Sequence, residues 1–215
     1  MNRTEQMIEK YARMSQFENE ARDSGFLQIA GIDEAGRGPL AGPVVAAACI
    51  LPDDYSILGL DDSKKLSASK RELLYEEIIR YSVSYSIVRI EPVVIDRINI
   101  LEATKEAMIQ CISELKIKPE IVLVDAVDLK RISMPCKPII KGDALSNSIA
   151  AASILAKVYR DRLMCEYDVV FPGYGFSQHK GYGTAQHYAA LKVLGICSIH
   201  RHSFLKSFFS GDVGN

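Results

Sequence analysis

The sequence predicts an α/β fold, with a central open sheet and helices packed against it. Short apolar runs bounded by glycine and proline are typical of strands, and segments with an apolar residue every three or four positions are typical of helices. Acidic residues stand at the ends of several apolar runs, and catalytic groups gather at strand ends in open α/β sheets. A chain of 215 residues suits one domain with a sizeable core and a small appendage.

Five apolar runs are expected to form strands, at 27–33, 44–51, 82–90, 121–125 and 137–140. A loop with three glycines and two prolines separates the first two, so the second strand is expected to return beside the first. The third run alternates apolar and polar residues. The fourth is apolar up to its final aspartate, which predicts a strand buried on both faces.

Helical spacing of apolar residues predicts helices at 2–22, 69–80, 95–116, 145–167 and 185–194. The first is polar with one apolar stripe and is expected on the outside of the domain. Ser69 and Glu72 form a capping box, and Thr184 and Gly195 bound the last helix. Alanines and serines crowd the start of the helix at 145–167, which lets it approach the sheet closely.

The composition is that of an ordinary globular protein, with 48% hydrophobic and 25% charged residues. The net charge of -1 gives no overall basic field for nucleic acid, although clustered catalytic acids would offset basic residues elsewhere. Five isolated cysteines predict free thiols in a reducing compartment. Neither a signal-length nor a membrane-spanning apolar segment is visible, so we expect a cytoplasmic protein.

Residues 31–43 combine two adjacent acids, Asp33 and Glu34, with a loop rich in glycine and proline. Acids at the end of a buried strand are costly unless they are paired or bind a cation, and glycines let backbone N–H groups approach a bound group. These residues predict a divalent-metal site beside a pocket for a phosphate or sugar. A solvated turn is the alternative. A phosphate-binding P-loop is excluded, because no Gly-Lys-Ser/Thr closes the loop.

Two further acids, Asp125 and Asp143, also follow apolar runs. Asp161 competes with Asp143, but along a continuous helix the two would lie about 27 Å apart, so they cannot serve one metal cluster. Asp143 is favoured, and Asp161 is expected to be structural. Oxygen ligands select Mg²⁺ or Mn²⁺, and two such ions can assist phosphodiester hydrolysis. The four histidines lack zinc-finger spacing, so we expect no transition-metal role for them.

Two segments are candidates for contact with a nucleic-acid backbone. Ser63, Lys64 and Lys65 are expected on a loop, where they would clamp phosphates or form only a solvated basic turn. Residues 171–184 are rich in glycine, aromatic and basic residues, which suits a surface against sugars and phosphates. The alternative is an irregular connection whose aromatic residues fill the core, as expected for Phe171 and Tyr174.

Taken together, these residues resemble the type 2 ribonucleases H, specifically bacterial ribonuclease HII. The similarity covers about residues 27–206. The related ribonuclease HIII resembles this chain less, because that family carries a large N-terminal domain that the first 25 residues cannot supply and a different residue in place of Arg37. The matching motifs are GIDEAGRGPLAGP at 31–43, DSK at 62–64, VDA at 124–126, KGD at 141–143, SIAAASILAKV at 148–158, RD at 160–161 and HKGYGT at 179–184.

The resemblance implies an RNase H-like fold with a central mixed five-stranded sheet flanked by helices. It implies a helical extension at 1–25, a catalytic domain at 26–207 and a short mobile tail at 208–215. The expected activity is hydrolysis of RNA in RNA–DNA hybrids and cleavage 5′ of single ribonucleotides in duplex DNA, leaving 3′-hydroxyl and 5′-phosphate ends. A monomer that acts on these duplexes, and not on membranes, is expected.

The resemblance also implies roles for individual residues. The metal ligands, for Mg²⁺ or Mn²⁺, and the catalytic residues would be Asp33, Glu34, Asp125 and Asp143. The loop Gly36-Arg37-Gly38 would read the 2′-hydroxyl that distinguishes RNA from DNA. Tyr182 would contact the sugar at the RNA-to-DNA junction, and Ser63 and Lys64 would hold the DNA backbone.

Two other functions are compatible with parts of this pattern. Another RNase H-like nuclease, such as a junction resolvase, would share the acids but would not need a 2′-hydroxyl sensor. A non-catalytic nucleic-acid-binding module is the second alternative, and the intact set of four acids argues against it.

Overall fold

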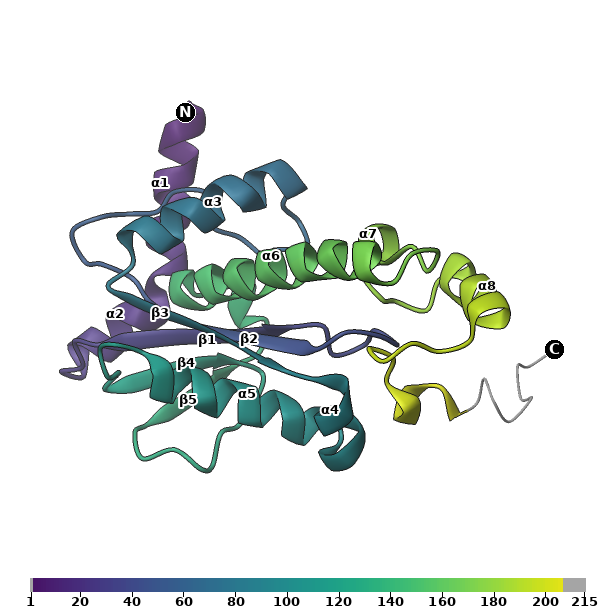
Figure 1. Cartoon of the computed structure of the whole chain (residues 1–215). Helices are drawn as coiled ribbons and strands as arrows, with labels where there is room; N and C mark the ends of the chain where they lie inside the picture. Colours follow the sequence, from purple (N-terminus) through teal and green to yellow (C-terminus); the bar gives the residue numbers. More distant parts are fainter. Residues whose placement is uncertain (1, 207–215) are drawn as a thin grey trace.

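The computed structural model describes residues 2–206, which form a five-stranded sheet with helices on both faces (Figure 1). The strands are β1 (Ile29–Ala35), β2 (Val44–Ile50), β3 (Ser84–Ile90), β4 (Ile121–Asp125) and β5 (Cys136–Ile139). Their order across the sheet is β3-β2-β1-β4-β5. β1 pairs antiparallel with β2 and parallel with β4, so the expected mixed five-stranded sheet is confirmed.

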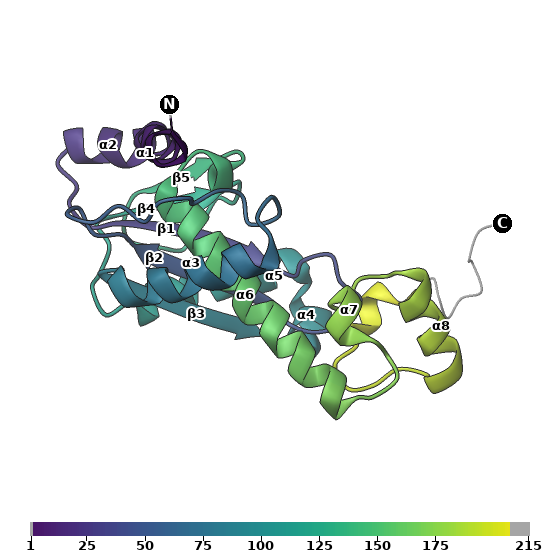
Figure 2. The ribbon, with the colours of Figure 1, turned by 90° about the horizontal axis from the view of Figure 1, so that it is seen from above.

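Helices cover both faces of the sheet (Figure 1 and Figure 2). One face carries α3 (Ala68–Tyr81) and α6 (Asn147–Val170), and the other carries α4 (Pro92–Ile98) and α5 (Ile100–Glu114). The remaining helices lie at the two ends of the molecule. They are α1 (Arg3–Met14) and α2 (Gln16–Asp23) at one end, and α7 (Phe176–His179) and α8 (Ala185–Leu194) at the other. Two 3₁₀ turns are η1 (Gly142–Ala144) and η2 (His202–Phe204).

The centre of the sheet is built from small residues that let the helices come close. β2 is buried along its whole length, with Ala46 packed in the core on the α5 side and Ala47 in the core under α3 and α6. A Cβ at Gly31 of β1 would lie only 2.0 Å from the carbonyl carbon of Ser148 in α6. The start of α6 is therefore seated directly on β1.

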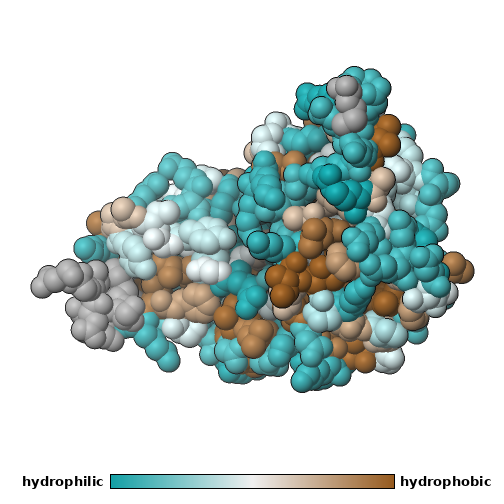
Figure 3. All heavy atoms as spheres, turned by 180° about the vertical axis from the view of Figure 1, so that it is seen from behind, coloured by the Kyte–Doolittle hydropathy of each residue, from teal (hydrophilic) through white to brown (hydrophobic). Residues whose placement is uncertain are grey.

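Two of the expected helices are each divided in the structure. The segment at 2–22 forms α1 and α2, which meet at Ser15. The Ser15 hydroxyl donates to the carbonyl oxygen of Tyr11 at 2.9 Å, a side-chain bond that competes with helix continuation. The segment at 95–116 forms α4 and α5, separated at Asn99, which has a φ of 66° and caps α5 with its side chain. α1 projects from the body with a largely hydrophilic surface (Figure 3).

Some expected boundaries were wrong by one or two residues. Ser67, and not Ser69, caps α3, accepting a hydrogen bond from the N–H of Lys70 at 3.3 Å. β1 runs to Ala35, so Asp33 and Glu34 lie within the strand and not at its end. α6 begins at 147 because the preceding residues form the turn η1. The tail expected at 208–215 lies outside the described residues, as does the last residue of the expected catalytic domain.

Within residues 2–206, every helix is too short or too polar to cross a lipid bilayer.

Candidate active site

Three carboxylates from separate parts of the chain meet beside β1. Asp33 lies in β1, Asp125 ends the neighbouring parallel strand β4, and Asp143 belongs to the turn η1. One carboxylate oxygen from each lies within 4.8 Å of the other two. The structure therefore brings together three of the four acids that the sequence singled out.

The turn that carries Asp143 is tied to Asp125. The N–H of Gly142 donates a 2.8 Å hydrogen bond to Oδ1 of Asp125. Lys141, just before it, takes the left-handed backbone conformation with a φ of 58°. A Cβ at Gly142 would lie 2.6 Å from Cδ1 of Ile149, so a larger residue would require the turn or the Ile149 side chain to shift.

Glu34, the fourth expected acid, is not one of the three grouped carboxylates. Successive residues of a strand point to opposite faces, and β1 continues past Glu34. Its Oε1 accepts a long hydrogen bond of 3.4 Å from Nη1 of Arg37. Its Oε2 is buried without a hydrogen-bond partner among the described residues. A buried, unpartnered carboxylate oxygen near other acids is suited to a cation.

The site collects negative charge in a buried position. Burial, and then repulsion from Glu34, raises the pKa of Asp33 well above its usual range. Burial, followed by repulsion from Asp62 and Asp125, raises the pKa of Asp143 to about 6. Burial also raises the pKa of Glu34, although Arg37 acts in the opposite direction. An all-oxygen donor set with surplus negative charge fits a hard divalent cation such as Mg²⁺ or Mn²⁺.

A cavity of about 250 Å³ lies beside these acids. Eight of its lining residues were singled out from the sequence: Asp33, Glu34, Gly36, Arg37, Gly38, Ser63, Lys64 and Tyr182. Four others were not: Ala35, Ser153, Lys157 and Arg160. The structure therefore places all the expected substrate-binding residues around one cavity next to the acids.

The loop after β1 is held from beneath by two buried arginines. Arg201 donates to the carbonyl oxygens of Gly36 (2.6 Å), Arg37 (2.8 Å) and Gly42 (2.9 Å). Arg160 lies so close to the loop that a Cβ at Gly36, whose φ is 92°, would be 2.0 Å from its Nε. The carbonyl oxygens of the loop thus accept hydrogen bonds from a buried side chain. These contacts fix the backbone conformation of the part of the loop that borders the cavity.

Arg160 connects this loop to the one that carries Tyr182. Its guanidinium donates to the carbonyl oxygens of Ala41 (3.1 Å), Pro43 (3.0 Å) and Lys180 (3.0 Å). Burial lowers the pKa of Arg160 to about 10, so the group remains charged at neutral pH. The three carbonyl oxygens satisfy much of its donor capacity.

Tyr182 lines the same cavity as Asp33 and Glu34 and lies on a loop whose backbone is held by hydrogen bonds. Its side chain is 46% exposed, and a Cβ at Gly38 would meet its ring at an ordinary contact distance of 3.7 Å. The N–H of Tyr182 donates to the carbonyl oxygen of His179, and the carbonyl oxygen of Tyr182 contacts Nδ1 of His187 at 3.0 Å. An exposed ring on a fixed backbone is suited to stacking against a sugar.

The loop with Ser63 and Lys64 borders the same cavity. Arg71 donates to the carbonyl oxygens of Ser63 (2.9 Å) and Leu66 (2.5 Å), which shapes the loop from within. Ser63 is buried and accepts a 3.0 Å hydrogen bond from the hydroxyl of Ser153. Lys64 lines the cavity, and its charge opposes the rise in the pKa values of Glu34 and Asp143.

Sequence reasoning gave no role to several residues of this site. Asp62 lies beside Asp143, and its only signal was its place in the DSK motif. The burial of Arg160 and Arg201 could not be foreseen, because an arginine in a polar stretch is usually exposed. Asp161, expected to be structural, lies outside the acidic group and pairs with Lys157 at 2.8 Å. Among residues 2–206, the acidic trio is the one group of metal-ligating side chains found, and it contains no histidine.

Comparison with known proteins gives a consistent picture. A family model described as ribonuclease HII matches residues 30–207. The chain is 56% identical over 207 residues to a ribonuclease HII of Ruminiclostridium cellulolyticum, covering 96% of this chain and 81% of that protein.

Two solved structures are similar in fold. The ribonuclease HII in a complex with PCNA from Archaeoglobus fulgidus is 34% identical, with a TM-score of 0.72, and the match covers 82% of this chain and 94% of that one. The ribonuclease H2 of Pyrococcus horikoshii is 28% identical, with a TM-score of 0.71, and the match covers 82% and 93% of the two chains. The expected RNase H-like fold is thereby confirmed.

Proposed function

The chain belongs to the ribonuclease HII family, so it is an endoribonuclease that acts on RNA–DNA hybrids, and we propose that it also cuts 5′ of single ribonucleotides embedded in duplex DNA. Both reactions are proposed to leave 3′-hydroxyl and 5′-phosphate ends. The observation that carries the proposal is that Asp33 belongs both to the group of three carboxylates and to the lining of the cavity that the loop Gly36-Arg37-Gly38 borders.

We assign the metal ligands to Asp33, Asp125 and Asp143, with Glu34 as a fourth. When bound, Mg²⁺ or Mn²⁺ supplies an activated water and stabilises the leaving oxygen of the phosphodiester. The protein itself holds these acids together at a buried position. Gly142 donates a hydrogen bond to Asp125, and Asp33 is fixed by its place in a central strand.

The other expected residues that line the cavity are proposed to select the substrate. The loop Gly36-Arg37-Gly38 would contact the 2′-hydroxyl of the ribonucleotide, largely through backbone groups that Arg201 holds in place. Tyr182 would lie against the sugar on the DNA side of the junction. Ser63 and Lys64 would hold a phosphate of the DNA backbone, and Lys64 would also offset part of the negative charge of the acids.

We further propose that the enzyme acts as a monomer in the cytoplasm. Its five cysteines are free thiols, which supports a reducing compartment. Sedimentation equilibrium at micromolar concentration tests the monomeric state.

The function is tested with three labelled duplexes of one sequence: an RNA–DNA hybrid, a DNA duplex with one ribonucleotide, and an all-DNA duplex. Each is incubated with the enzyme in Mg²⁺, in Mn²⁺ and in EDTA, and the product ends are identified by ligation and phosphatase treatment. We expect cleavage of the first two duplexes only, with a divalent ion, and a cut 5′ of the single ribonucleotide. Equal cleavage of the all-DNA duplex would contradict the proposal.

A further inference from the structure

Glu18 is a buried acid of α2 and lies outside the segment that matches the family model. Only 6% of its surface is exposed. Its Oε1 accepts hydrogen bonds from the hydroxyls of Ser146 and Ser148, both at 2.6 Å, and from the N–H of Ser148 at 2.9 Å. A carboxylate is favourable at the N-terminus of a helix, where N–H groups are unpaired. Glu18 therefore holds the first turn of α6 from the N-terminal extension.

The residues that Glu18 holds are continuous with the acidic site. Ser146 caps α6, and its N–H donates to the carbonyl oxygen of Gly142 at 2.9 Å. Gly142 in turn donates its own N–H to Asp125, and Asp143 is the next residue along the chain. One unbroken set of hydrogen bonds thus leads from Glu18 to the turn η1 and to Asp125.

A second link runs from the same turn of α6 to β1. The backbone of Ser148 packs directly on Gly31, which lies two residues before Asp33. A displacement of Ser148 would therefore alter how α6 is seated on the strand that carries Asp33. The start of α6 thus contacts Gly142, which neighbours Asp143 and binds Asp125, and Gly31 of the strand that carries Asp33.

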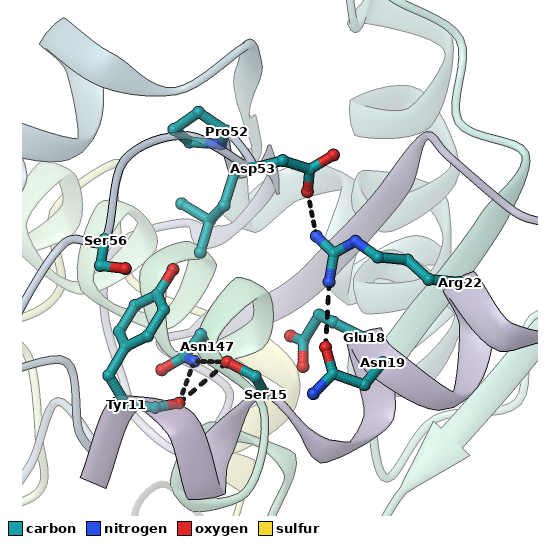
Figure 4. Close-up of a pocket in the computed structure, with 10 residues that line it drawn as sticks. Tyr11, Ser15, Glu18, Asn19, Arg22, Pro52, Asp53, Ser56 and Asn147 are labelled. Atoms are coloured by element: carbon teal, nitrogen blue, oxygen red, sulfur yellow. Dashed lines mark hydrogen bonds and ion pairs between the residues drawn. The ribbon is translucent and has the colours of Figure 1, made fainter. Parts of the chain in front are cut away.

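Asn147 completes the attachment of the extension. Its Nδ2 donates to the carbonyl oxygen of Tyr11 at 2.8 Å and to the hydroxyl of Ser15 at 2.9 Å. Figure 4 shows these contacts at the edge of a cleft of about 460 Å³, with Glu18 beside it and the ion pair of Arg22 and Asp53 above. Consecutive residues at the start of α6 are thus held by the extension.

The attachment has a cost in folding free energy. Oε2 of Glu18 and Oδ1 of Asn147 are both buried without a hydrogen-bond partner among residues 2–206. Buried polar atoms without partners are destabilising, and apolar side chains would avoid this cost. Local costs of this kind are expected where the position of a group matters for function.

We propose that Glu18 is a positioning residue for the acidic site: by fixing the first turn of α6, it keeps Asp143 at the distance from Asp33 and Asp125 that a divalent cation requires. This inference rests on the metal-dependent function proposed above. It gives the N-terminal extension a defined role in metal binding.

The test measures Mn²⁺ binding to the full-length protein by calorimetry, together with the Mn²⁺ concentration for half-maximal cleavage of the hybrid. Glu18→Ala removes the acceptor, whereas Glu18→Gln retains one oxygen that can accept the same three hydrogen bonds. Glu20→Ala is the matched control, because Glu20 is an exposed acid of the same helix that pairs with Lys137. Thermal unfolding is measured for every variant.

We expect Glu18→Ala to weaken Mn²⁺ binding by about 3- to 30-fold and to raise the half-maximal concentration in parallel, with the KM for the hybrid unchanged. Glu18→Gln and Glu20→Ala should bind Mn²⁺ as the wild type does. If Glu18→Ala does not fold, Ser148→Ala, which removes one hydroxyl donor and keeps the N–H, should weaken Mn²⁺ binding in the same direction.

Unchanged Mn²⁺ binding by folded Glu18→Ala, or by Ser148→Ala where Glu18→Ala fails to fold, would overturn the positioning role. So would Glu18→Gln behaving like Glu18→Ala. These results leave the proposed function intact, since that function is tested separately, by cleavage of the three duplexes with the wild-type protein.

Discussion

The backbone N–H of Gly142 donates a hydrogen bond of 2.8 Å to Oδ1 of Asp125. This contact joins the end of β4 to the turn η1 and so fixes Asp143, the next residue, relative to Asp125. This backbone contact thus directly links the supports of two of the three grouped acids.

Asp33→Asn should abolish cleavage while hybrid binding persists. The substitution removes a proposed metal ligand and leaves Lys64, Tyr182 and the loop after β1 in place. It should also stabilise the protein in EDTA, because burial, and then repulsion from Glu34, raises the pKa of Asp33 and the charged form is therefore costly in the folded protein. Cleavage assays, hybrid-binding titrations and thermal unfolding check the three parts.

Asp161→Asn is the matched control for that substitution. Asp161 lies outside the acidic group and pairs with Lys157, so its variant should cleave at close to the wild-type rate. Full activity of Asp33→Asn would contradict the assignment of Asp33.

Gly36→Ala should destabilise the protein, whereas Gly38→Ala should not. A Cβ at Gly36 would lie 2.0 Å from Nε of the buried Arg160, and its φ of 92° is strained for alanine. We expect a loss of about 2 to 4 kcal/mol, or a fall of roughly 5 to 15 °C in Tm, and slower cleavage because the loop shifts. At Gly38 the nearest atom is 3.7 Å away, on Tyr182. Equal Tm values for the two variants would count against the fixed loop.

The free energy of unfolding should fall in mild acid, because the buried His200 resists protonation in the folded protein. His200 is 1% exposed, and Nδ1 accepts the N–H of Cys197 at 2.9 Å, which leaves Nε2 to donate to Nε2 of His187 at 3.0 Å. Burial, and then the neighbouring His187, lowers the pKa of His200 to about 4. The unfolded chain, with a pKa near 6.5, binds the proton first, so stability is complete above about pH 6.5 and is lost as the pH falls toward 4.

Urea unfolding at pH 8 and pH 5 measures this effect. We expect the wild type to lose about 2 kcal/mol more than His200→Gln between these two values. The exposed His202 serves as control, and His202→Gln should follow the wild type. A pH dependence that is the same in wild type and His200→Gln would show that His200 titrates normally.

The acids of the site could be predicted because their signal is local. Asp125 ends a run of buried apolar residues, and β4 has the bounds that the sequence predicted. Asp143 follows the next short strand, β5. Because β4 and β5 are parallel neighbours, the acids that follow their ends come close together. Helix geometry showed that Asp143 and Asp161 could not serve one cluster, and the place of Asp143 beside a strand end favoured it. The acidic group contains Asp143 and not Asp161.

The supports of the site could not be predicted because they depend on tertiary contacts. Arg160 and Arg201 bind carbonyl oxygens of loops that are distant in sequence. The RD motif at 160–161 marked Arg160 without indicating this role, and no motif marked Arg201. Glu18 had a weak signal: it follows Met14 by four residues and so falls on the apolar stripe of the first predicted helix. The break at Asn99 was missed because its side-chain cap of α5 lies inside a continuous apolar pattern.

The most direct test of the acidic site is an anomalous diffraction experiment on crystals of the wild-type protein with Mn²⁺. Manganese density is expected in direct contact with carboxylate oxygens of Asp33, Asp125 and Asp143, beside the cavity bordered by Gly36 and Tyr182. Crystals of active enzyme with no manganese at these three acids, or with manganese bound only elsewhere, would contradict the proposed metal site.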